Sequence, residues 1–122
     1  MYKEIKLGEK TVPMIANAAT ALRYKLVFGK ELIGEFQNIE SDAVRGMNTL
    51  PELTFIMAKA AEAKEGKADM NKLNQEIYIE WLEQFDPMDI PDAASDILDL
   101  YMGNTKTTSE PKKNESAKVK EK

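Results

Sequence analysis

The sequence predicts an α+β fold that is mainly α, with a short N-terminal β-hairpin packed on a small bundle of four to five helices and a disordered C-terminal tail. Three observations lead to this prediction. Polar and apolar residues alternate near the N-terminus, apolar residues recur every three or four positions between residues 16 and 103, and only two apolar residues occur from position 105 onward. We therefore predict a single globular domain over residues 1–103 and a Lys/Glu-rich tail over 104–122.

The hairpin is predicted at the N-terminal end of the sequence. Ile5 and Leu7 would share one face of an extended strand, residues 8–10 offer a turn, and a second strand follows over 11–15. Because Pro13 cannot donate to a sheet ladder, the second strand is expected to be an edge or to end there. A lone hairpin is marginal in water, so the helix that follows is expected to cover it.

Two short helices are predicted next. The first ends at Gly29, which can adopt the left-handed conformation that closes a helix, and its inward residues are spaced by three and four positions: Ala19, Leu22 and Leu26. The second is expected over Glu31 to Gln37, with an inward face of Leu32, Ile33 and Phe36. Residues 38–50 hold few apolar side chains and are expected to form a short helix plus a loop.

Three more helices are predicted in the rest of the domain. Pro51 suits the first position of a helix that should end near residues 64–66, with a buried stripe of Leu53, Ile56, Met57, Ala60 and Ala61. The next should span 70–85, capped by Asp69 and stopped by Asp86-Pro87, with an inward face of Met70, Leu73, Ile77, Trp81 and Phe85. The last should begin at Pro91, close at Gly103, and carry Ala94, Ile97, Leu98, Tyr101 and Met102.

The composition excludes several classes of chemistry. The chain contains no cysteine and no histidine, so the usual nucleophile–base pairs, thiolate catalysis and zinc sites are excluded. Its glycines are scattered singly and form no phosphate-binding loop. We expect no enzyme activity, no catalytic residue and no cofactor. The lack of a long apolar run predicts a soluble, intracellular protein.

Charge is distributed unevenly along the chain. Residues 1–103 hold 11 basic and 18 acidic side chains, a net charge of −7, whereas residues 104–122 hold six lysines and three glutamates, a net charge of +3. Eight acidic residues and no Lys or Arg lie between Leu73 and Thr105. A solvated helix face is the favoured interpretation; a docking face for a basic partner stays open, and a divalent-cation site is less favoured. The tail lacks arginine and aromatic residues, so it is expected to solubilise the protein rather than to bind nucleic acid.

Aromatic and methionine side chains supply the candidates for partner binding. Trp81 and Phe85 fall on the inward stripe and are assigned to the core, whereas Tyr78 lies at its margin and is the better surface candidate. Methionine suits an adaptable binding surface. The predicted partner-binding residues are Tyr78, Met88, Tyr101 and Met102.

The N-terminal third also carries a resemblance to a known family. A Thr-Ala-Leu-Arg-Tyr helix (residues 20–24) runs into Phe-Gly-Lys-Glu-Leu (residues 28–32), after a Gly-Glu-Lys turn (residues 8–10). This combination resembles the tail assembly chaperones of long-tailed, siphovirus-like bacteriophages that infect Gram-positive hosts. The likeness is greatest over residues 1–36 and is a matter of layout over 51–102.

The resemblance implies an assembly chaperone that binds the tape measure protein, a long, helix-rich chain that fixes tail length. Such a chaperone keeps that protein soluble and recruits tail tube subunits in the host cytoplasm, and it is absent from the mature virion. The resemblance also implies a longer product made by translational frameshifting, for which the codons of Lys112 to Asn114 are the candidate slippery site. Self-association stays open, as do two other functions: a structural subunit of the head-tail connector or tail, and a small acidic regulatory protein.

Overall fold

The computed structural model describes residues 1–39 and 43–103. In chain order the described elements are β1 (Tyr2–Leu7), β2 (Lys10–Ile15), α1 (Thr20–Phe28), α2 (Leu32–Ile39), α3 (Ala43–Lys64), the 3-10 helix η1 (Met70–Lys72), α4 (Gln75–Leu82), α5 (Asp89–Asp92) and α6 (Ala94–Met102). The predicted fold class, α+β and mainly α with an N-terminal hairpin, is confirmed. The predicted tail and the candidate frameshift codons fall at 104–122, outside the described residues.

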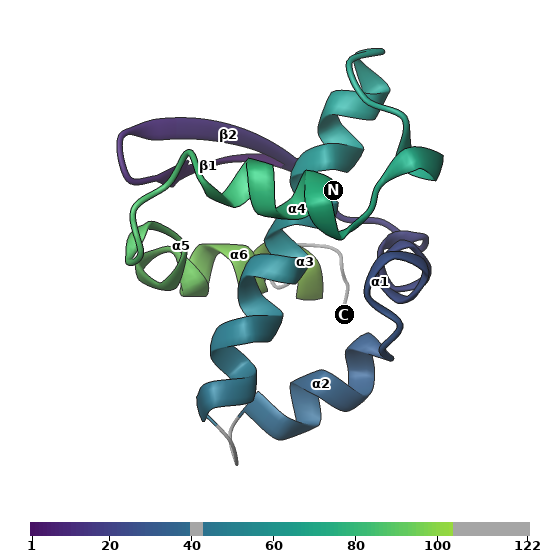
Figure 1. The fold of residues 1–122 in the computed structure, drawn as a ribbon. Helices are drawn as coiled ribbons and strands as arrows, with labels where there is room; N and C mark the ends of the chain where they lie inside the picture. The colour runs from purple at the N-terminus through teal and green to yellow at the C-terminus, as the bar shows by residue number, and fades with distance from the viewer. Residues whose placement is uncertain (40–42, 104–122) are drawn as a thin grey trace, which may run out of the picture.

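The long helix α3 forms the centre of the molecule, and the other elements surround it (Figure 1). It contacts β2, α1, α2, η1, α4 and α5. Every residue from Leu53 to Ala58 is buried, which is the pattern of a helix covered on all sides. The predicted stripe is confirmed for Leu53, Ile56, Met57 and Ala61, and the buried surface extends further round the helix than the apolar spacing indicates.

The two strands form the predicted hairpin. Ile5, Leu7 and Met14 are buried on its inner face, and Pro13 lies opposite Glu4 inside β2. The hairpin packs mainly on α3, α5 and α6, while α1 lies on the other side of α3 (Figure 1). The expectation that the next helix covers the hairpin was therefore wrong, because the chain crosses to the far side of α3 before that helix begins.

The hairpin turn fits closely against α5. Gly8 has a φ of +67°, and a Cβ added there would lie 2.6 Å from the carboxylate of Asp89. That carboxylate accepts a hydrogen bond from the backbone N–H of Asp86 at 2.9 Å, which holds it in place at the start of α5. Only glycine meets both conditions, the left-handed backbone and the close approach, without strain.

The inward face of α1 differs from the predicted one. Ala19, Leu22 and Leu26 are exposed, the last by 68%, whereas Tyr24 is buried. The Tyr24 hydroxyl donates a hydrogen bond to the Glu52 carboxylate of α3 at 2.7 Å. Because this contact satisfies the polar end of the tyrosine, its large ring occupies the inward position that the leucines were predicted to hold.

The α1–α2 connection confirms one prediction and corrects another. Gly29 ends α1 in the left-handed conformation, with a φ of 72°, as expected. In α2, Leu32 is buried as predicted, but Ile33 is exposed. Glu35 is buried in its place, and the Thr49 hydroxyl of α3 donates to this carboxylate at 3.3 Å. A hydrogen-bonded polar residue thus takes a position that apolar spacing gives to isoleucine.

Helix α3 begins earlier than predicted. It runs from Ala43 through Pro51 to Lys64, so the predicted helix start at Pro51 and the loop before it were wrong. Thr49 and Leu50, directly before the proline, are buried, and this end of α3 packs on α2. That packing offsets the interior proline, whose missing hydrogen bond and ring clash cost about 3 kcal/mol in a helix.

The single helix predicted over 70–85 is broken in two. The Asp69 carboxylate accepts the backbone N–H of Asn71 at 2.9 Å and starts η1, and the Asn74 side chain accepts the N–H of Ile77 at 2.9 Å and starts α4. Side chains that bond to nearby backbone groups favour caps over helix interiors. Asn74 therefore opens a new helix inside the predicted one.

The last predicted helix is also divided. Pro91 lies within α5 and not at the start of the final helix. Helix α6 ends at Gly103 with a φ of 65°, as predicted. Ile97 is buried as expected, but Met102 is exposed and Leu100 faces inward instead. Ile97 and Leu100, three positions apart, therefore form the buried side of α6.

Candidate protein-interaction surfaces

Tyr78 was predicted to lie on the surface, and this was wrong. Its side chain is only 9% exposed, and its ring centre lies 5.0 Å from that of Phe28 and 5.1 Å from that of Phe55. Burial, followed by the nearby charge of Glu52, raises the pKa of its hydroxyl above the ordinary value. Tyr78 lies three residues before Trp81 on α4, so the two side chains share the buried face of this helix.

Trp81 belongs to the core, as predicted. It is buried, and its ring packs against Phe55 at 5.5 Å and Phe85 at 4.9 Å between ring centres. Phe55 belongs to α3, and Phe85 follows the end of α4. The aromatic cluster therefore joins the central helix to the acidic C-terminal half of the domain.

The other three predicted partner-binding residues do not form one site. Tyr101 is half-buried against Phe36, with 5.3 Å between ring centres. Met88 and Met102 are exposed by 58% and 62%, but Met88 directly precedes α5 and Met102 ends α6, so they lie at opposite ends of this segment. The exposure of the two methionines suits partner contact, and their binding role stays a prediction.

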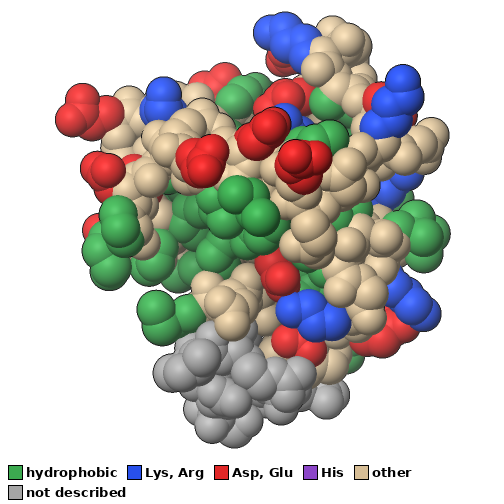
Figure 2. Space-filling model, viewed as in Figure 1, with side chains coloured by type: hydrophobic (Ala, Val, Ile, Leu, Met, Phe, Trp, Pro, Cys, Tyr) green, Lys and Arg blue, Asp and Glu red, His purple; other side chains and the backbone are tan. Residues whose placement is uncertain are grey.

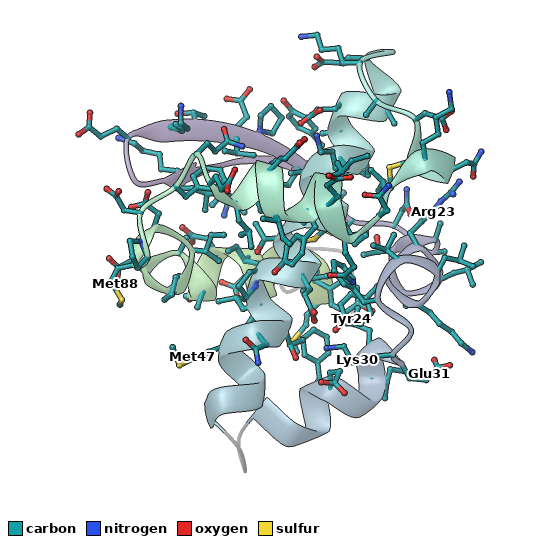
Figure 3. The ribbon with its side chains drawn as sticks, in the orientation of Figure 1. Arg23, Tyr24, Lys30, Glu31, Met47 and Met88 are labelled. Carbon is teal, nitrogen blue, oxygen red and sulfur yellow. The ribbon has the colours of Figure 1, made fainter. Side chains whose placement is uncertain are left out.

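A hydrophobic area covers the side of the molecule below α4 and beside α5 (Figure 2). Met88 and Met47, both strongly exposed, lie at its margins and point toward the same side (Figure 3). We call this area, with Met47 and Met88 at its edge, the methionine face. Single exposed apolar residues are normal on a protein surface, but apolar side chains gathered together mark candidate sites for partner contact.

Acidic side chains line the α4 edge of the methionine face (Figure 2). Glu76, Glu80 and Glu83 are exposed along and just after α4, and in the part of the chain that the structure describes none of the three forms an ion pair. This agrees with the favoured interpretation of a solvated acidic face. Within residues 1–39 and 43–103, no group of three or more acidic side chains is arranged to hold a metal ion.

A hollow lies on the α1 side of α3. It has a volume of about 350 Å³ and is walled by the end of β2, the first turn of α1, the last turns of α3 and η1. Its floor is apolar and is formed by Ile15, Ile56, Ala60, Ala63 and Met70, while its charged lining is basic and consists of Arg23 and Lys64. We call this hollow the basic pocket.

Sequence reasoning missed the basic pocket. Its walls come from four segments between positions 15 and 70, and the spacing of residues within any one of them carries no signal for a hollow. Helical spacing assigns Arg23 to the polar side of the first helix and gives it no role.

A polar cluster ties α1 to α3 beside the aromatic core. Glu52 accepts hydrogen bonds from the Tyr24 hydroxyl at 2.7 Å and from the Lys30 ammonium at 2.9 Å (Figure 3). Burial, and then the bond to Glu52, raises the pKa of the Tyr24 hydroxyl well above its ordinary value. The two hydrogen bonds to Glu52 join α1 and the turn after it to α3.

Comparisons of this chain with protein-family models, with curated proteins and with solved structures found no match. Among the described helices, none is both long enough and apolar enough to cross a membrane. The function is therefore inferred from the two surfaces described above and from the residues that carry the resemblance in the N-terminal third.

Proposed function

We propose that this protein is a phage tail assembly chaperone that binds the tape measure protein, keeps it soluble in the host cytoplasm and recruits tail tube subunits. The observation that supports this proposal most is the methionine face, an apolar area bordered by exposed glutamates of α4. A chaperone of this kind acts by covering apolar surface, so it requires no catalytic group.

The chemistry of the methionine face suits a long helical partner. Methionine side chains are unbranched and polarisable, so they adapt to different apolar residues along a chain. An amphipathic helix lays its apolar side into such a surface through residues spaced by three and four positions. The glutamates along α4 then stay in water and keep the complex soluble through its net charge.

The direct test is co-expression with a candidate tape measure protein encoded in the same genome. The wild-type chain should raise the soluble fraction of that protein several-fold. The double variant Met47→Glu, Met88→Glu places two charges at the edge of the methionine face and should abolish most of this gain, because a carboxylate resists burial against an apolar helix.

Leu26→Glu is the matched control, since it also places a glutamate at a strongly exposed apolar position, but on α1. It should leave the solubilising effect unchanged. A tape measure protein that is equally insoluble with and without the wild-type chain would contradict the proposed function. Equal loss in the control and the double variant would contradict the assignment of the methionine face.

A further inference from the structure

The basic pocket combines an apolar floor with two cations at its rim. The Arg23 guanidinium donates to the neutral side-chain oxygen of Asn71 at 2.8 Å. Across residues 1–39 and 43–103, neither Arg23 nor Lys64 forms an ion pair with a carboxylate. This is notable in a domain whose acidic residues outnumber its basic ones by 18 to 11 over residues 1–103.

The size and lining of the pocket limit what it can hold. A volume of about 350 Å³ lies at the lower end of the range of ligand sites, roughly 300–1,000 Å³. Alanines at positions 60 and 63 leave the floor open, and isoleucine at 56 and methionine at 70 make it apolar. The hollow therefore has room for an apolar side chain, and its rim favours a negative charge beside that side chain.

We infer that the basic pocket receives an acidic amphipathic helix of a protein partner, with one apolar side chain seated on the floor and a neighbouring carboxylate paired with Arg23 and Lys64. A helix presents these two groups together, because residues three or four positions apart lie about 5–6 Å from each other. This inference rests on the proposed function in one respect: it identifies the partner helix as a segment of the tape measure protein.

The inference also separates the pocket from the methionine face. A helix flanked by glutamates is repelled by the acidic edge of α4 and attracted by Arg23 and Lys64. The overall negative charge of the domain does not prevent this, because charges farther apart than about 8 Å are largely screened at physiological salt. Two surfaces with rims of opposite charge would thus bind different stretches of one long partner and fix its position along the chaperone.

The first test uses two synthetic helical peptides and the full-length chain labelled with ¹⁵N. Both peptides are designed with about sixteen residues, which form about four helical turns. Both carry leucines spaced four positions apart. One has glutamates on both sides of the leucine stripe, and its twin has lysines at the same positions. The glutamate peptide should shift the amide signals around Ala60 and Ala63. Signals that move on α4 instead, equal binding of the twins, or no binding of the glutamate peptide at about 1 mM would overturn the inference.

Variants then test each part of the pocket. Lys64→Gln removes one cation and should weaken the glutamate peptide about twofold to fivefold, as expected for an exposed ion pair. Ala60→Leu fills the floor while keeping a good helix former and should weaken binding about tenfold or more. Lys6→Gln on the hairpin makes the same charge change outside the pocket and should have no effect. Unchanged affinity in Ala60→Leu would exclude the pocket as the seat of the leucine.

The tape measure protein distinguishes a failure of this inference from a failure of the proposed function. If the wild-type chain solubilises that protein and Ala60→Leu does so equally well, the function stands and the pocket inference falls. If the glutamate peptide binds in the pocket but no tape measure protein is solubilised, the pocket stands and the proposed partner is wrong.

Discussion

The basic pocket and the methionine face offer apolar surface in opposite ways. The pocket is a defined hollow built from small and branched side chains of four segments, and its rim carries Arg23 and Lys64. The methionine face is an open area with long, flexible side chains at its margin and glutamates along its α4 edge. Both surfaces offer apolar area, but they differ in rim charge and in side-chain flexibility, two properties that govern specificity in protein recognition.

The difference in charge follows from the sequence of the helices. Lys64 ends α3, where the negative end of the helix dipole favours a cation. Residues 73–103, which contain α4 to α6, hold eight acidic residues and no Lys or Arg. The basic rim comes from α1 and α3, whereas the acidic edge comes from α4, so the two surfaces have rims of opposite charge.

The largest expected effect concerns the core that both surfaces share. Trp81 packs on Phe55 of α3, so Trp81→Ala should destabilise the domain by about 3–5 kcal/mol and loosen the methionine face together with the pocket. Urea unfolding measures the loss. Emission of the wild-type tryptophan should be blue-shifted from that of the unfolded chain, and a water-like maximum in the folded protein would contradict its burial.

The next effect is a loss of stability at high pH, which involves Tyr24 of α1 and Tyr78 of α4. Tyr24 and Tyr78 have pKa values raised above the ordinary 10.0. Above that pH the unfolded chain loses phenol protons that the folded chain keeps, so stability falls as pH rises, by about 1.4 kcal/mol per pH unit for each tyrosine. Below pH 10 both contributions are fully present.

Urea titrations at several pH values above 10 test this dependence. Tyr24→Phe should remove a large part of the slope, because a phenylalanine has no proton to lose. Tyr78 and Tyr101, whose pKa values burial also raises, should keep the remainder. Tyr2→Phe, at an exposed position, is the control and should leave most of the slope. A wild-type stability that stays constant well above pH 10 would show that these two hydroxyls are reached by water.

A smaller effect is expected at the hairpin turn beside α5. Gly8→Ala requires a left-handed alanine and brings its Cβ against the Asp89 carboxylate, so it should cost about 2 kcal/mol. Gly29→Ala is the matched control: its φ is also positive, at 72°, but a Cβ there meets nothing within 4 Å, and it should cost only about 1 kcal/mol. Equal losses in thermal unfolding would mean that α5 moves aside freely.

Sequence pattern predicted the elements that depend on local order and failed where distant groups decide. The alternation of Ile5 and Leu7 and the left-handed glycine at 29 required no knowledge of the rest of the fold. The inward turn of Tyr24 depends on Glu52 of α3, which helical spacing cannot reveal. Burial of the residues before Pro51 likewise outweighed a local signal for a helix start.

For the candidate surfaces, the sequence predicted the type of residue involved but not which residues lie together. Exposed methionines were expected, and Met88 and Met102 are exposed, yet the fold places them at opposite ends of α5–α6. The basic pocket was missed because its floor joins residues from position 15 to position 70. A hollow of this kind depends on the packing of four segments and is not written into the spacing of any one of them.

The smallest expected effect separates the two surfaces most directly, through salt. Raising the ionic strength from about 0.15 M to about 0.5 M shortens the Debye length and weakens exposed ion pairs. The glutamate peptide should therefore lose affinity for the basic pocket by about twofold to threefold, the loss expected when pairs worth about 0.2–1 kcal/mol are screened. Apolar contact does not weaken with salt, so the complex formed through the methionine face should persist unchanged.

Fluorescence titration of the peptide and affinity capture of the tape measure complex at both salt levels measure the two responses. Dissociation of the tape measure complex at the higher salt in a variant that lacks the pocket cation, Lys64→Gln, would instead make the glutamates of α4 the main docking site.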